Sequence, residues 1–113
     1  SDRSDSEKSE VIRGRVISAR KIQSARFEDL EGIHYNAQMS SKLIKQHCNP
    51  DEDSLQLLKN AMERLNLSAR AYDRILKVSR TIADLDNAEN ITSNHIAEAI
   101  QYRSLDREDW ING

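Results

Sequence analysis

The sequence predicts a small all-α protein, a bundle of about four to five helices. Its 113 residues include three Gly and one Pro, so few residues interrupt helices. Charged residues make up 32% and hydrophobic residues 37%, a balance that suits helices with one buried and one solvated face. Apolar residues recur at intervals of three and four, which indicates helices rather than strands. A chain of this length builds one domain around one modest hydrophobic core.

The first helix is predicted over about residues 7–26. Its apolar stripe consists of Val11, Ile12, Val16, Ala19 and Ile22. Its other face is basic and carries Arg13, Arg15, Arg20, Lys21 and Arg26. Two interpretations of this basic face stay open: a solvated surface, or a contact with a phosphate or an acidic neighbouring subunit. Residues 1–8 are too polar to pack and are expected to form a flexible lead-in.

Two shorter helices are predicted after a loop that turns at Gly32. The second helix begins at its N-cap Ser40 and ends at Cys48, because Pro50 disfavours helix in the residue before it. It is expected to bury Leu43, Ile44 and His47. Acidic residues at 51–53 suit the start of the third helix. The apolar stripe of that helix consists of Leu55, Leu58, Ala61, Met62 and Leu65.

The fourth helix is predicted over about residues 69–85, after the N-cap Ser68. Its apolar side is broad, and consists of Ala71, Tyr72, Ile75, Leu76, Val78, Ser79, Ile82, Ala83 and Leu85. Such breadth places this helix at the centre of the bundle. A polar stripe remains, made of Arg70, Asp73, Arg74, Lys77, Thr81 and Asp84.

A last helix is predicted from Thr92 or Ser93 to about Arg103. Its inward-facing residues are Ile96, Ala99 and Ile100. Residues 105–113 form a tail that is polar apart from Leu105, Trp110 and Ile111. We expect Trp110 to pack onto the bundle or onto a partner domain.

The start of the fourth helix carries cations where a helix favours anions. Arg70 and Arg74 fall in its first two turns and lie on one face, and a cation there costs roughly 0.3–1 kcal/mol. A phosphate would remove the conflict, because the planar arginine fork binds two phosphate oxygens and the helix N–H groups favour the same anion. An ion pair with Glu63 or another acid across the turn at Asn66 is the structural alternative.

Several segments resemble, in the same order, the C-terminal lid of the magnesium-chelatase-like AAA+ ATPases. They are "IRGRVISARKIQSARF", "NAQMSSKLIKQHC" and "LNLSARAYDRILKVSRTIADLDNAENITSNHIAEAIQYRSLDR". The sequence of these segments is most similar to the YifB/ComM type, bacterial proteins tied to DNA processing during natural transformation. The resemblance covers about residues 7–110 and implies an AAA+ lid domain over residues 9–104.

This resemblance implies roles for the two arginines. The arginine of the family's S-x-R-A-Y stretch, which falls on Arg70, is the sensor 2 residue that reaches the γ-phosphate of ATP. Arg74 has no comparable family role and is a candidate second contact. The cofactor of the parent protein is ATP with Mg²⁺. The implied partners are the AAA+ core of the same chain, neighbouring subunits of a hexameric ring, and DNA through the full-length protein. Whether Arg70 acts in cis or in trans stays open.

The printed sequence contains neither GxxxxGK[ST] nor GxGxxG. We therefore expect an excised lid that is no enzyme alone and binds ATP weakly, while its parent is an ATPase. His34, His47, His95 and Cys48 lack paired metal-ligand spacing, so no metal site is expected. With no long apolar run, a soluble, cytoplasmic protein without membrane contact is expected. Two alternatives stay open: a stand-alone helical domain that binds nucleic acid or protein, and the lid of a true magnesium chelatase subunit.

Overall fold

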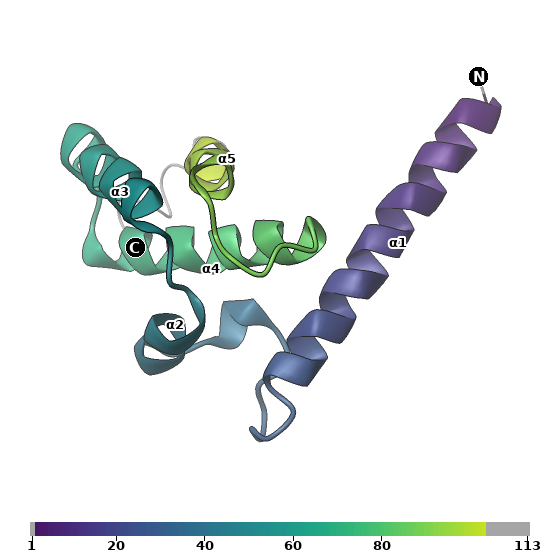
Figure 1. Ribbon diagram of the computed structural model, residues 1–113, viewed down its shortest axis with the longest axis horizontal. Coiled ribbons are helices and arrows are strands. Elements are labelled where there is room, and N and C mark those ends of the chain that lie inside the picture. Colours follow the sequence, from purple (N-terminus) through teal and green to yellow (C-terminus); the bar gives the residue numbers. More distant parts are fainter. Residues whose placement is uncertain (1, 104–113) are drawn as a thin grey trace.

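The computed structural model describes residues 2–103, with only the backbone described for residues 2–6 and 103. Within this range the chain forms five α-helices and one short 3₁₀ helix, arranged as the predicted small all-α bundle (Figure 1). The elements are α1 (Asp2–Arg26), η1 (Asn36–Gln38), α2 (Ser41–His47), α3 (Glu52–Leu65), α4 (Ala69–Leu85) and α5 (Ser93–Arg103). The predicted bounds of the fourth helix are confirmed. The predictions for the tail over residues 105–113 and for Trp110 lie outside the described residues.

Local sequence signals explain where the helices begin and end. The side chains of Ser40, Asp51 and Ser68 each accept a hydrogen bond from a backbone N–H in the first turn of the following helix. Helix α3 ends at Asn66, which adopts the left-handed conformation with φ 51°. Asn tolerates this conformation better than most residues because its short polar side chain bonds locally. Gly32 turns the loop after α1 with φ 77°, as predicted.

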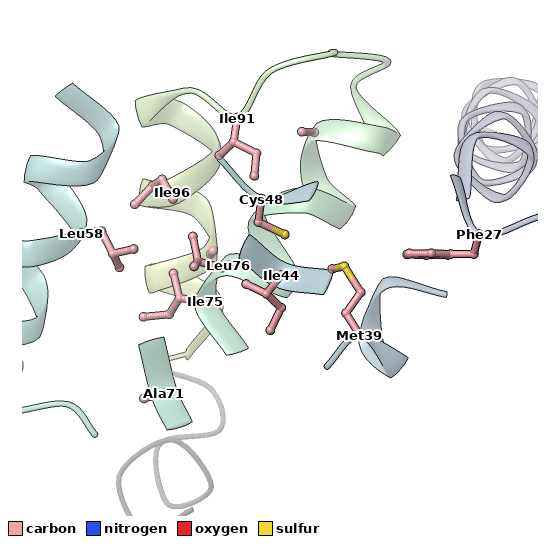
Figure 2. Close-up of a cluster of buried hydrophobic side chains, with 12 residues drawn as sticks. Phe27, Met39, Ile44, Cys48, Leu58, Ala71, Ile75, Leu76, Ile91 and Ile96 are labelled. Atoms are coloured by element: carbon pink, nitrogen blue, oxygen red, sulfur yellow. The ribbon is translucent and has the colours of Figure 1, made fainter. Parts of the chain in front are cut away.

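Helix α4 lies at the centre of the bundle and packs against α1, η1, α2 and α5. The core gathers around it, with Leu58 of α3, Ile75 of α4 and Ile96 of α5 fully buried (Figure 2). Met39, Ile44 and Phe27 extend this core toward the C-terminal end of α1 (Figure 2). The broad apolar side predicted for the fourth helix therefore contacts several neighbours, as its width indicates.

Helix α1 differs from the prediction at its N-terminal end. It begins at Asp2, so residues 2–8 continue the helix instead of forming a separate lead-in. Its first half extends away from the other helices (Figure 1). Val11 and Ile12, predicted to be buried, are 64% and 58% exposed, whereas Ala19 is buried. The stripe has the right period, but the bundle covers only the C-terminal part of the helix.

Candidate functional site

The turn between α3 and α4 positions the start of the arginine-bearing helix. Ser68 Oγ accepts a hydrogen bond of 3.1 Å from the backbone N–H of Ala71. The first turn of α4 contains no acidic residue. Arg70 thus lies directly at the electropositive end of a long helix, as the sequence predicts.

A groove of about 870 Å³ runs along α4 and is bordered by the segment from η1 to α2. It is lined by Ala37, Met39, Ser40, Ser41, Ile44, Arg70, Asp73, Arg74, Lys77, Val78, Thr81, Ile82, Leu85 and Tyr102. Five of the six residues of the predicted polar stripe belong to this lining. The structure therefore places Arg70 and Arg74 in one groove, together with Lys77.

Arg70 is exposed, and no hydrogen bond or ion pair joins it to another of the described residues. The ion pair with Glu63 considered from the sequence does not form. Nearby polar groups are engaged: Ser41 Oγ donates to Asp73 Oδ2 at 3.1 Å, and Lys77 Nζ donates to the carbonyl of Ala37 at 3.2 Å. Arg70 thus lines the groove, and none of the described residues neutralises its guanidinium.

The charges of this groove favour an anion. Arg70, Arg74 and Lys77 follow one another along one face of α4, with Asp73 as the acidic residue among them. Ser40, Ser41 and Thr81 add hydroxyl groups to the lining. Phosphate oxygens accept hydrogen bonds from guanidinium, ammonium and hydroxyl groups alike, so the donor set fits a phosphate.

The other end of the same polar stripe is buried and holds the bundle together. Asp84 is 1% exposed and accepts two hydrogen bonds of 2.7 Å from the guanidinium of Arg26. Its carboxylate also accepts from Arg80 Nε at 3.2 Å and from Asn36 Nδ2 at 2.8 Å. Four donors from α1, η1 and α4 therefore satisfy one buried carboxylate.

This network corrects the interpretation of the basic face of α1. Arg26 contacts Asp84 of its own chain, so it is neither a solvated charge nor a contact with an acidic neighbouring subunit. Arg15 Nε donates to the carbonyl of Leu85 at 3.1 Å, where α4 ends and its carbonyl groups lack helical partners. Arg13, Arg20 and Lys21 remain exposed.

Arg80 is a structural residue that the sequence-based reasoning missed. It is 5% exposed, and it donates to the carbonyls of Ala88 at 2.7 Å and Glu89 at 3.0 Å. It thereby ties the loop before α5 to α4. The sequence contained one signal for this role: Arg80 lies four residues before Asp84 and next to the apolar side of the central helix. Such a pair lies on one face of the helix.

His47, His95 and Cys48 serve packing and capping. The ring of His47 contacts Phe27 edge-on, with 5.6 Å between the ring centroids. His95 Nδ1 accepts from the backbone N–H of Thr92 at 3.0 Å, and Asp86 Oδ2 lies 3.1 Å from its Nε2. Burial raises the pKa of the Cys48 thiol to about 11. Over residues 2–103 no three His, Cys, Asp or Glu side chains lie close enough together to hold a metal ion.

Comparison with known proteins decides the family. The family profile described as "Magnesium chelatase, subunit ChlI C-terminal" matches residues 6–103, nearly the whole chain. The chain belongs to this family of magnesium chelatase C-terminal domains. Competence protein ComM of Haemophilus influenzae is 42% identical over 101 residues, and YifB of Escherichia coli is 40% identical over 101 residues. An uncharacterized protein of Mycobacterium bovis, Mb2921c, is 30% identical over 99 residues.

These matches confirm a C-terminal domain of the YifB/ComM type. They cover 89% of this chain but only 19% of the ComM and YifB proteins, so the chain spans about a fifth of the length of these relatives. Neither alternative function drawn from the sequence is favoured by them. Across the described part of the chain, no helix combines the length and apolar character that a membrane crossing requires.

Proposed function

We propose that this domain is the lid of an AAA+ ATPase and that Arg70 is its sensor 2 residue. One observation carries the proposal: Arg70 is exposed at the first turn of α4, has no partner among the described residues, and lies in line with Arg74 and Lys77 along one groove. Because no described side chain neutralises the Arg70 guanidinium, a negatively charged group from outside the domain can bind it.

The chemistry of Arg70 suits contact with a transferring phosphoryl group. Negative charge on the γ-phosphate changes during hydrolysis, and a fixed guanidinium stabilises that charge without reorganisation. ATP with Mg²⁺ would supply the reactive phosphoanhydride, and the AAA+ core would bind most of it. In this domain Arg70 would donate hydrogen bonds to the phosphate, Arg74 would be a second donor, and the helix N-terminus would add its N–H groups.

The buried network around Asp84 would transmit movement from this contact to the rest of the domain. Arg70 begins α4, and Asp84 near its other end is bonded to Arg26 of α1. A displacement of α4 at the phosphate therefore also displaces the end of α1. We propose that the parent protein is a ring-forming, hexameric motor that acts on DNA. The similarity to ComM, which is named a competence protein, and the resemblance to the YifB/ComM type support DNA as the substrate of this motor.

The test is ATP turnover of the full-length parent protein, wild type against Arg70→Ala. We expect turnover to fall by about 10²–10³-fold, the usual loss when one donor to a developing charge is removed. Arg70→Lys should recover only part of it, because an ammonium group lacks the bidentate fork. Arg64→Ala is the matched control, since Arg64 is an exposed arginine on α3 outside the groove.

Nucleotide binding, ring assembly and thermal unfolding are followed in parallel for every variant. A loss of turnover in an assembled, folded ring supports the sensor assignment. Turnover of Arg70→Ala equal to that of Arg64→Ala would reduce Arg70 to a surface charge. Isolated, the 113-residue chain should bind ATP only weakly; a millimolar dissociation constant corresponds to about 4 kcal/mol.

A further inference from the structure

Lys77 is the third cation of the groove along α4 and lies two turns after Arg70 on the same face. Its Nζ donates to the backbone carbonyl of Ala37 at 3.2 Å. This hydrogen bond is exposed to solvent, and its acceptor carries no net charge. The carbonyl satisfies one of the three ammonium donors but does not neutralise the ammonium. Lys77 therefore brings to the groove a positive charge that a phosphate would offset.

The hydrogen-bond partner of Lys77 lies next to the buried network around Asp84. Ala37 is the middle residue of η1, and its neighbour Asn36 is fully buried. Asn36 Nδ2 donates to Asp84 Oδ2 at 2.8 Å, and Asn36 Oδ1 accepts from the guanidinium of Arg26 at 2.8 Å. The contact of Lys77 is thus one residue away from the network that joins η1, α1 and α4.

The contacts of η1 differ in how readily they can exchange. The hydrogen bond between Asn36 and Asp84 is buried, so its loss would leave polar groups unsatisfied away from water. The hydrogen bond between Lys77 and Ala37 is exposed, so water can replace either partner at little cost. A lysine also has a flexible four-carbon stem and three rotatable donors. Its ammonium can therefore change acceptors while the backbone of α4 stays in place.

We propose that Lys77 is a further phosphate-binding residue of this domain, and that it exchanges the Ala37 carbonyl for phosphate when the groove is occupied. The inference rests on the proposed function, because it needs a phosphate at Arg70. Arg70 and Lys77 begin about 10 Å apart along the helix axis. Two long cationic side chains at this spacing suit a chain of linked phosphates, such as the triphosphate of ATP, better than a single phosphate. Occupancy of the groove would then remove one contact that holds η1 against α4.

The test uses NMR of the 113-residue protein with inorganic tripolyphosphate as the probe, at constant ionic strength and without turnover. The amide of Gln38 shares a peptide group with the Ala37 carbonyl, so its chemical shift reports the hydrogen bond from Lys77. We expect the side-chain resonances of Arg70 and Lys77 and the amide of Gln38 to respond together, with one dissociation constant. Orthophosphate should bind more weakly.

The variant Lys77→Met removes the charge and the donors but keeps an unbranched side chain. We expect its affinity for tripolyphosphate to fall about tenfold. In the absence of the probe, its Gln38 amide should move toward the shift of the saturated wild type. Arg70→Met should also weaken binding but leave the phosphate-free shift of Gln38 unchanged. The matched control is Lys45→Met, which removes the same charge from an exposed site on α2 outside the groove lining and should bind like the wild type.

Far-UV circular dichroism verifies that each variant keeps its helices, and Lys77→Gln replaces Lys77→Met if that variant does not. Three results would overturn the inference: binding by Lys77→Met as tight as by Lys45→Met, a Gln38 amide of the wild type that does not respond to the probe, or no saturable binding of the probe to the wild type. The first two results, with binding still weakened in Arg70→Met, would overturn the role of Lys77 alone. ATP turnover of the parent protein tests the proposed function separately.

Discussion

Arg26 and Asp84 form a bidentate ion pair, with two hydrogen bonds of 2.7 Å, although 58 residues separate them in the sequence. The pair joins the end of α1 to the end of α4, and Asn36 and Arg80 complete it. The site at Arg70 lies at the opposite end of α4. One helix thus carries an exposed, available charge at its start and a buried, fully satisfied charge near its end.

Asp84→Asn should strongly destabilise the domain. The variant removes the negative charge and leaves the partly buried Arg26 and the buried Arg80 without their counter-charge, a loss of about 3–5 kcal/mol for a broken buried pair. The measurement is the free energy of unfolding from urea titration monitored by circular dichroism. Asp29→Asn, on an exposed turn, should change it little. Equal stability of the two variants would show that the network does not hold α1 to the bundle.

Ser68→Ala should lower the free energy of unfolding by about 1 kcal/mol, because the N–H of Ala71 loses its capping acceptor. Thermal unfolding of the variant measures this loss. Ser24→Ala is the matched control, an exposed serine inside α1 where alanine is the better helix former. An equal effect of Ser68→Ala and Ser24→Ala on the free energy of unfolding would show that the cap does not stabilise the helix.

Stability should fall as the pH is lowered through about 6.5 because of His47. Burial, and then the charges of Arg26 and Arg80, lower the pKa of this imidazole below its usual 6.5. The unfolded chain therefore binds the proton more readily than the folded chain between the lowered pKa and 6.5, so stability rises with pH in this window. NMR titration measures the pKa of His47 in the folded protein, and urea unfolding at several pH values measures the free energy of unfolding. His47→Gln should flatten the dependence; a folded-state pKa at or above 6.5 would contradict the prediction.

Cys48 should resist alkylation by iodoacetamide in the native protein at neutral pH. Its side chain is buried, so the reagent cannot reach the sulfur. Burial also raises the thiol pKa to about 11, so only a small fraction is thiolate at neutral pH. Mass spectrometry of the protein with and without urea compares the two rates. We expect rapid modification only after unfolding. Equal rates in both states would place Cys48 at the surface.

The elements of the fold were largely predictable because their signals are local. Ser40 and Ser68 precede helices as N-caps, Gly32 turns the loop, and the apolar spacing predicts the bounds of α4. The position of Arg70 was predictable for the same reason, since the Ser68 cap places it in the first turn of α4, while its role as a sensor stays a prediction. Arg80 and Asp84 were not, because periodicity shows which residues share a face but not what covers that face.

The sequence by itself determined the helices, the central position of α4 and the row of cations at its start, because caps, turns and apolar spacing act over a few residues. Only the tertiary structure decided the environment of each polar residue. Asp84 and Arg70 belong to one stripe, yet α1 and η1 cover the first and no described element neutralises the second. It also decided that α1 extends past the bundle, so that Ile12 is exposed while Ala19 is buried. Burial depends on contacts between distant segments, and a charge is buried only where such contacts bring its partners together.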